Sequence, residues 1–150
     1  MKVVVAIDSL KGSLSSLEAG EAIKSGVLKA MPDAEVYVRP LADGGEGTVE
    51  ALALGMGGEL KTVEVTGPLG EKVNCLYGIL EESKTAIVEM SGAAGITLVP
   101  DELKNPLHTT TYGVGEVIKD AIANGCRHFI VGIGGSATND GGIGMLQALG

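Results

Sequence analysis

A glycine-rich segment near the end of the chain carries the side chains best suited to bind a small anion. It reads GIGGSATNDGG over residues 132–142, where glycines are combined with hydroxyl, carboxamide and carboxylate groups. Successive backbone N–H groups in such a segment can form a concave nest for an anion, and polar side chains can add hydrogen bonds. The segment therefore predicts a site for phosphate or another small anion. The residues expected to contact the anion are Gly134, Gly135, Ser136, Thr138 and Asn139.

The same segment allows a second interpretation, because residues 132–137 match the G-x-G-x-x-A pattern of dinucleotide-binding folds. In those folds a helix starts near the second glycine, whereas here the run NDGG at residues 139–142 would interrupt its first turn. We therefore expect the helix to begin only at Ile143, and a dinucleotide-dependent oxidoreductase is the weaker alternative. The sequence contains no Walker A motif and no protein-kinase loop, which excludes the two commonest phosphoryl-transfer templates.

Two further loops each lie just ahead of a predicted helix. One combines charged groups with hydroxyls, and the other combines acidic groups with glycines. The first reads DSLKGS, and its candidate ligand-binding residues are Asp8, Ser9, Lys11 and Ser13. The second reads ADGGEGT, and its candidates are Asp43, Gly44, Gly45 and Gly47. Helix N-termini bind phosphate and carboxylate groups, and glycines let the main chain approach a ligand closely. A capped turn for the first loop and an ordinary glycine-rich turn for the second are the alternatives without function.

Hydrophobic periodicity predicts the elements that must position these loops. The apolar, β-branched run at residues 2–7 is typical of a strand buried on both faces of a parallel sheet. A capping box of Ser15 and Glu18 starts the following helix, and Pro32 ends it. Further helices are expected at 48–54, at 114–124 and from 143, and further strands at 34–38, 60–65, 72–77, 85–90 and 128–131.

The connections between these elements indicate an α/β fold. Strands and helices alternate over the first 55 residues, but the three extended segments between residues 60 and 90 are joined by short turns, which favours antiparallel pairing. A linker-like stretch with Pro100 and Pro106 follows them. Each of the three polar loops stands at the carboxyl end of a predicted strand, where open α/β sheets form ligand crevices. The loops are therefore expected to share one site.

Composition restricts the function further. The chain has 150 residues, 45% of them hydrophobic, which is enough for a packed core. Its net charge is −8 and its basic residues are scattered, so nucleic acid and anionic membranes are not expected partners. The N-terminal residues form no signal peptide or membrane span, and we expect a cytoplasmic protein. Cys75 and Cys126 lack metal-ligand spacing and are expected to be reduced structural thiols.

Five motifs extend in order over essentially the whole chain. They read DSLKGSLSSLEAGEAI, PLADGGEGTVEAL, VTGPLGEKV, NPLHTTTYGVGEVI and GIGGSATNDGGIGMLQALG. Together they resemble the N-terminal part of the bacterial glycerate kinases, a family without a P-loop that phosphorylates D-glycerate with ATP. The resemblance implies ATP, Mg²⁺ and D-glycerate as ligands and 2-phosphoglycerate as the product.

The resemblance also implies a domain organisation. Members of the family have a Rossmann- or flavodoxin-like parallel-sheet domain into which a second, mixed α/β domain is inserted. Residues 1–57 are thus expected to form the first part of the outer domain and residues 58–150 the first part of the inserted one. Family proteins are more than twice as long as this chain and form their site between the domains, so the chain is expected to be a fragment or a truncated product that holds part of the site. The oligomeric state is left open, a homo-oligomer included.

The roles that follow from the resemblance centre on three charged residues. Lys11 is expected to offset charge on the transferred phosphoryl group or on the glycerate carboxylate. Asp43 or Asp140 is expected to serve as general base or Mg²⁺ partner. Positioning and charge neutralisation would then provide most of the catalysis. A module that binds a nucleotide or anion without catalysis is the alternative.

Overall fold

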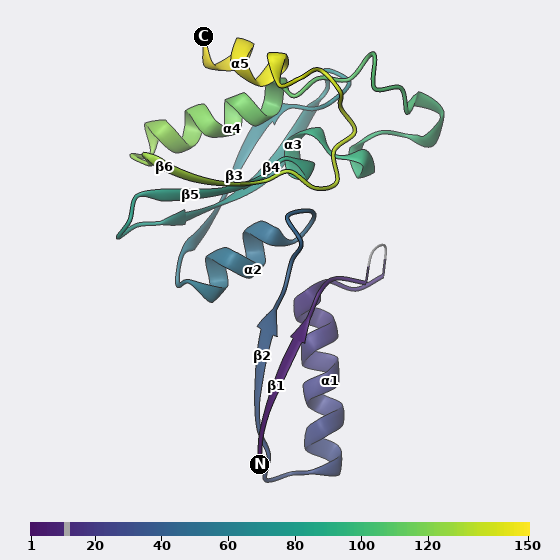
Figure 1. Ribbon diagram of the computed structural model, residues 1–150, viewed down its shortest axis with the longest axis vertical. Coiled ribbons are helices and arrows are strands. Elements are labelled where there is room, and N and C mark those ends of the chain that lie inside the picture. Colours follow the sequence, from purple (N-terminus) through teal and green to yellow (C-terminus); the bar gives the residue numbers. More distant parts are fainter. Residues whose placement is uncertain (11–12) are drawn as a thin grey trace.

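The structure is a computed structural model that describes residues 1–10 and 13–150 (Figure 1). Its first unit is a βαβ arrangement of β1 (Lys2–Ile7), α1 (Ser16–Ala30) and β2 (Glu35–Pro40). The two strands pair in parallel, with Val3 opposite Val36. The capping box that starts α1 is confirmed, since the Glu18 backbone N–H donates to Ser15 Oγ at 3.2 Å and the Ser15 N–H donates to Glu18 Oε2 at 2.9 Å.

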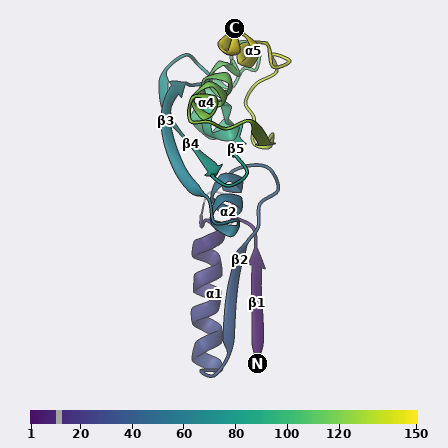
Figure 2. The same ribbon diagram turned by 90° about the vertical axis from the view of Figure 1, so that its left-hand side faces the viewer.

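The burial of β1 differs from the prediction. Val5 is 7% exposed, but its neighbour Val4 is 66% exposed. Figure 2 shows the reason, because α1 lies along one face of the β1–β2 pair. A strand covered on one face alternates between buried and exposed residues, so the expectation of burial on both faces is wrong for this strand.

The second unit is a four-stranded mixed sheet in the order β3–β4–β5–β6. Its strands are β3 (Glu59–Thr66), β4 (Lys72–Leu80), β5 (Thr85–Glu89) and β6 (His128–Gly132). The pairs β3–β4 and β4–β5 are antiparallel, which confirms the prediction from the short turns, whereas β6 runs parallel to β5. The three segments predicted as consecutive extended elements therefore form one continuous antiparallel ladder, and a late strand extends it.

Helices cover both faces of this sheet (Figure 1). On one face lies α2 (Thr48–Gly55), and on the other lie α3 (Ser91–Ala94), α4 (Tyr112–Ala123) and α5 (Ile143–Leu149). Each face has its own apolar cluster. The α2 side contains Val49, Ala53, Leu80 and Ile87. The α4 side includes Val65, Tyr77, Val88, Val114 and Val117 together with Cys75 and Cys126, which are both free and buried.

One predicted segment differs from the observed elements, and one predicted helix start agrees with them. The stretch around Pro100, predicted as linker-like, contains α3 and the short 3-10 helices Ile96–Leu98 and Asp101–Leu103. The expected start of the last helix at Ile143 is confirmed. None of the helices within the described residues is long and apolar enough to span a membrane.

The packing of α2 bears on how the chain divides. Val49 and Ala53 of α2 share an apolar cluster with Leu80 of β4 and Ile87 of β5. These contacts join α2 to the mixed sheet, although it follows β2 directly along the chain. The predicted domain boundary after residue 57 remains a prediction, while α2 packs with strands that follow it in the chain. The loop between β2 and α2 then connects two packed units.

Two helical glycines should respond in opposite ways to alanine. A Cβ at Gly115 of α4 would overlap the carbonyl oxygen of Met145 and lie 2.7 Å from Ala148 Cβ, whereas at Gly26 of α1 it would meet nothing within 4 Å. We expect Gly115→Ala to lower the free energy of unfolding by about 1–3 kcal/mol through overpacking against α5. Gly26→Ala should raise it by roughly 0.5–1 kcal/mol. Urea denaturation measures both, and equal shifts would contradict the packing of α4 on α5.

Candidate functional site

The two units meet where the loop after β2 touches the loop after β6. The N–H of Gly134 donates to the carbonyl of Gly44 at 2.8 Å. A Cβ at Gly132 would lie 2.6 Å from that carbonyl oxygen, and one at Gly134 would lie 2.8 Å from Gly45 N and Cα. Glycine is required here because two main chains approach more closely than any side chain allows. The carboxyl ends of strands from two different sheets are thereby held together.

A cavity of about 410 Å³ lies beside this contact. Its walls come from the loop between β1 and α1, the first turns of α1 and α2, and residues of β4 and β5. The lining residues are Ser9, Ser13, Leu14, Ser15, Ser16, Glu46, Gly47, Val49, Glu50, Leu76 and Glu89. Three residues predicted for the site, Ser9, Ser13 and Gly47, are among them. The first two loops thus form one pocket, and the third closes on the second from outside it.

The described walls of the cavity are acidic and rich in hydroxyls. Glu46, Glu50 and Glu89 supply carboxylates, four serines supply hydroxyls, and no described lining residue is basic. Lys11, the cation expected for the site, lies outside the described residues. The helices α1 and α2 both begin at the wall, and helix N-termini carry partial positive charge. Hydroxyl groups of a ligand can be held by the carboxylates, and its anionic groups by the helix N-termini.

Glu89, the last residue of β5, makes the longest-range polar contact in this wall. Its Oε2 accepts the N–H of Val49 in the first turn of α2 at 3.1 Å, and its Oε1 accepts the Ser91 hydroxyl at 3.4 Å. Burial raises the pKa of Glu89 above its usual value, and hydrogen bonds from the backbone around Val49 and from Ser91 offset this only in part. The carboxylate therefore gives α2 the cap that its own N-cap, Gly47, cannot provide.

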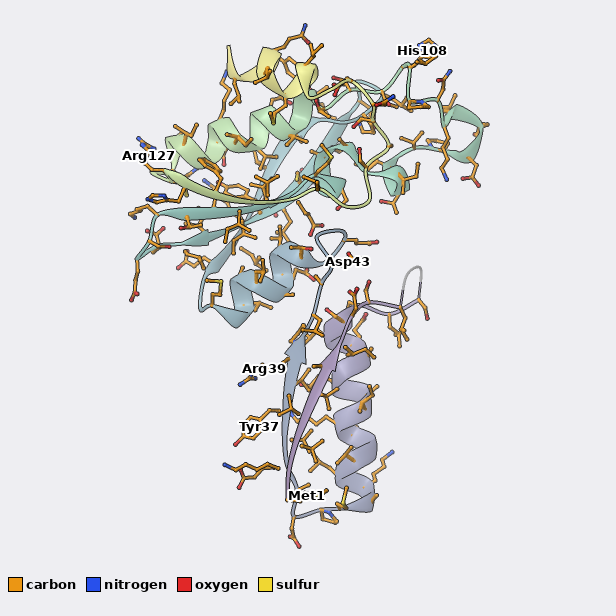
Figure 3. All side chains as sticks on the ribbon, viewed as in Figure 1. Met1, Tyr37, Arg39, Asp43, His108 and Arg127 are labelled. Atoms are coloured by element: carbon orange, nitrogen blue, oxygen red, sulfur yellow. The ribbon has the colours of Figure 1, made fainter. Side chains whose placement is uncertain are left out.

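Two predicted aspartates lie at the ends of β1 and β2. Asp43 is exposed on the loop between β2 and α2, and its Oδ1 accepts the N–H of Gly45 at 3.1 Å. Figure 3 shows it between the two-stranded unit and the mixed sheet. Asp8 is half-buried, and its Oδ1 accepts the Ser9 N–H at 2.6 Å. Each carboxylate fixes its own turn, as aspartate commonly does in loops.

The polar groups of the third loop are largely bonded within the loop and to its neighbours. Ser136 Oγ lies 2.8 Å from Thr138 Oγ1 and accepts the Thr138 N–H at 3.0 Å. The carbonyl of Gly135 accepts the N–H of Ile96 at 2.8 Å, and Asn139 is exposed. These bonds give the loop one defined conformation, in which Gly134 faces the loop after β2.

Asp140 faces away from that contact and toward two helix starts. Its carboxylate accepts the N–H groups of Thr111, Gly142 and Gly144 at 2.9, 2.9 and 3.1 Å, and also the Thr111 hydroxyl. Burial tends to raise the pKa of Asp140, but the hydrogen bonds from Thr111, Gly142 and Gly144 outweigh it, so the pKa lies below its usual value. The residue joins the start of α4 to the start of α5.

The carboxylates at the junction differ in their ability to bind a divalent cation. Among the described residues, no three His, Cys, Asp or Glu side chains gather as a metal site. Mg²⁺ in phosphoryl-transfer sites commonly uses only one or two carboxylates together with substrate phosphates. The exposed Asp43 fits such a minimal requirement, whereas both oxygens of Asp140 already accept several hydrogen bonds.

Comparison with known proteins assigns the chain to a family. The model of the glycerate kinase family matches residues 3–150. The chain belongs to this family. Among curated relatives, it is 55% identical to Glycerate kinase of Haemophilus influenzae, 53% to Glycerate 2-kinase of Escherichia coli and 51% to Glycerate kinase of Bacillus subtilis, each over 150 residues. All of the chain is covered in each match, but only 40%, 39% and 39% of those proteins.

A solved structure supports the same assignment. The crystal structure of a Salmonella typhimurium LT2 protein, a candidate glycerate kinase 2, superposes with a TM-score of 0.82 at 53% sequence identity. The match covers the whole of this chain and 40% of that one. The mixed α/β architecture described above is therefore that of a glycerate kinase family member, and the chain spans about 40% of the length of the relatives it matches.

Sequence reasoning missed the carboxylates of the cavity. Glu46 lies within the loop ADGGEGT but was not chosen as a site residue, Glu50 follows that loop, and Glu89 lies in the strand predicted at 85–90. The signal available for Glu89 was a charged residue directly after the apolar run TAIV, at a strand's carboxyl end. The same positional argument that selected the three loops applies to it. The contact with Val49, 40 positions away, had no local signal.

Proposed function

We propose that the protein carrying this chain is a glycerate kinase that transfers the γ-phosphoryl group of ATP to the C2 hydroxyl of D-glycerate, giving 2-phosphoglycerate and ADP. The match to the glycerate kinase family over residues 3–150 carries this proposal. The name of the E. coli relative, Glycerate 2-kinase, supports the C2 position. The junction of loops and helix N-termini beside an approximately 410 Å³ cavity is a suitable place for a small hydroxy acid and phosphate groups.

Several residues of this chain would each have a different role in the phosphoryl transfer. Asp43 accepts the proton of the attacking hydroxyl, whose oxygen forms a bond to phosphorus while the bond to the leaving ADP oxygen breaks. Backbone N–H groups of the two glycine-rich loops around Gly45 and Gly135 orient anionic groups. Lys11 offsets negative charge on the phosphoryl group or on the glycerate carboxylate. Mg²⁺, which neutralises phosphate charge in such reactions, would take Asp43 as its protein partner if a separate group served as base.

The choice of Asp43 over Asp140 rests on their hydrogen bonds. The only donor to Asp43 among the described residues is the N–H of Gly45, and the side chain is exposed at the junction. Asp140 holds the starts of α4 and α5 through Thr111, Gly142 and Gly144. A carboxylate that already accepts four donors is poorly suited to take a proton from substrate.

The test uses a hybrid in which residues 1–150 replace the matching 39% of the E. coli relative. We expect ADP release that depends on D-glycerate, with phosphorus on C2 of the product by NMR. The 150-residue chain alone, assayed in parallel, reports whether residues 1–150 suffice for turnover. A hybrid that unfolds cooperatively but releases no ADP with D-glycerate would overturn the proposal, and tight ATP binding without turnover would favour the binding-module alternative.

Neutralising Asp43 should remove most of the activity. We expect Asp43→Asn to lower kcat of the hybrid about 100- to 10,000-fold, the usual contribution of a general base, with the unfolding midpoint unchanged because the side chain is exposed. Asp33→Asn is the matched control, since Asp33 is also exposed but lies in the turn between α1 and β2, at the other end of the strand pair. Steady-state kinetics measure kcat of both variants, and equal activity of the two would exclude Asp43 as the base.

A further inference from the structure

Helix α2 begins without a side-chain cap of its own. Its N-cap is Gly47, at a φ of 87°, and Gly47 has no side chain to bond the free N–H groups of the first turn. Such groups need an acceptor when they are shielded from water. Val49, which carries one of them, is 1% exposed, and Glu89 Oε2 accepts its N–H at 3.1 Å. A carboxylate from the mixed sheet therefore completes the start of α2.

The same carboxylate stands next to the third loop. Ser91, whose hydroxyl donates to Glu89 Oε1, is buried at the start of α3. A Cβ at Gly135 would lie 3.1 Å from Ser91 Cβ, so Ser91 is in direct contact with that glycine. One carboxylate oxygen of Glu89 therefore bonds α2, which follows the loop after β2. The other oxygen bonds Ser91, which contacts the loop after β6.

The loop after β2 is coupled directly to the first turn of α2. The hydroxyl of Thr48 donates to the carbonyl of Gly45 at 2.7 Å, so the first turn of α2 and the end of the loop move together. Gly44 is bonded to Gly134, and Asp43 directly precedes it. Any shift of the first turn of α2 is therefore passed on to Asp43 through four residues of main chain.

We propose that Glu89 is a positioning residue of the kinase site: through the first turn of α2 and through Ser91, it holds the loop at residues 41–47 against the loop at 133–142, so that Asp43 faces the reacting hydroxyl. This inference rests on the proposed function, because it assigns Glu89 a part in that reaction. Glu89 acts through α2 and does not need to touch substrate. Its negative charge is favourable at a helix N-terminus, which an uncharged side chain of the same size does not reproduce.

The chain offers a matched control for such a contact. Glu116 of α4 also accepts a backbone N–H from a distant strand, that of Thr66 in β3 at 2.6 Å. Glu116 is not among the residues that line the cavity, and its helix α4 covers the other face of the mixed sheet. Glu116→Gln and Glu89→Gln therefore remove the negative charge from the same kind of interaction, one away from the site and one beside it.

The experiment compares these variants in the active hybrid. We expect Glu89→Gln to lower kcat about 10- to 100-fold, the range for a small misplacement of a reacting group, with KM nearly unchanged. Glu116→Gln should leave both constants unchanged. In the Asp43→Asn background, Glu89→Gln should have little further effect, because a residue that acts through Asp43 loses its influence when that carboxylate is gone. Amide hydrogen exchange at Val49 should be faster in the Glu89→Gln variant than in the unsubstituted hybrid, and Glu116→Gln should not change it.

Several outcomes would contradict the inference. A normal kcat in Glu89→Gln, a multiplicative loss when it is combined with Asp43→Asn, or a rise in KM alone would each overturn it. Glu89→Asp is a second variant that retains the charge, and it should recover part of the lost kcat. Failure of the unsubstituted hybrid to turn over D-glycerate would instead reject the proposed function, so the two failures are distinguishable.

Discussion

Replacing Gly134 by alanine is expected to lower kcat/KM of the hybrid about 100-fold, the scale of loss that accompanies a shift of roughly 1 Å in reacting groups. The new Cβ would lie 2.8 Å from Gly45 N and Cα and 3.0 Å from the Gly44 carbonyl carbon. Main-chain atoms on both sides cannot rotate out of the way, so the two loops must separate. The hydrogen bond from Gly134 N–H to Gly44 would be strained as well. Steady-state kinetics with D-glycerate and ATP measure the effect.

The control for Gly134→Ala is Gly26→Ala, which adds the same methyl group in open space on α1. It should leave the kinetic constants unchanged. A Gly134→Ala variant with normal kinetics would show that the close approach of the two loops is not needed for turnover. Thermal unfolding of both variants separates a local displacement from loss of the folded state, because overpacking of this kind costs about 1–3 kcal/mol rather than abolishing folding.

Removing the Asp140 carboxylate should produce the largest loss of stability. Asp140→Ala leaves the N–H groups of Thr111, Gly142 and Gly144 without their acceptor. An unsatisfied shielded donor costs about 1–3 kcal/mol, and water can reach part of this site, so we expect the free energy of unfolding to fall by about 3 kcal/mol in total. Urea denaturation of the 150-residue chain measures it. Asp43→Ala, which removes one hydrogen bond at an exposed turn, is the comparison and should cost far less.

The stability that Asp140 contributes should depend on pH. Its pKa in the folded chain lies below the usual value, because hydrogen bonds to the charged form outweigh burial. A group with a lowered folded pKa stabilises fully above its unfolded pKa, which is about 3.9 for aspartate. The part of the contribution that belongs to the charged form should therefore be present at neutral pH and be lost as pH falls below about 4 through the folded pKa. A difference in the free energy of unfolding between the wild type and Asp140→Ala that does not shrink in acid would contradict this assignment.

Local sequence patterns predicted most of the elements. The strand at residues 2–7, the capping box at Ser15 and Glu18, the antiparallel segments and the helix start at Ile143 are all confirmed. Each depends on side chains within a few positions of one another, through capping, turn chemistry or hydrophobic periodicity. The exposed face of β1 was not predictable in the same way, since an apolar run does not reveal how many layers cover it.

The site was predicted only in outline. The three loops were recognised because glycines, hydroxyls and carboxylates follow predicted strands, and two of the loops do contribute to one cavity. The acidic wall with Glu89 was missed, and Asp140 could not be distinguished from Asp43. Both aspartates precede glycines in similar sequences, DGG in each case. Their environments differ because Thr111, 29 residues before Asp140, donates to one and has no counterpart at the other among the described residues.

The sequence by itself determined the family, the order of the elements and the residue types available for chemistry, because these follow from motifs and from interactions between near neighbours. Only the tertiary structure decided that α2 packs on the mixed sheet, that Gly134 meets Gly44, and that Glu89 caps Val49. The last two of these contacts join residues 90 and 40 positions apart. Their geometry depends on how two sheets and their helices pack against each other, which no local preference specifies.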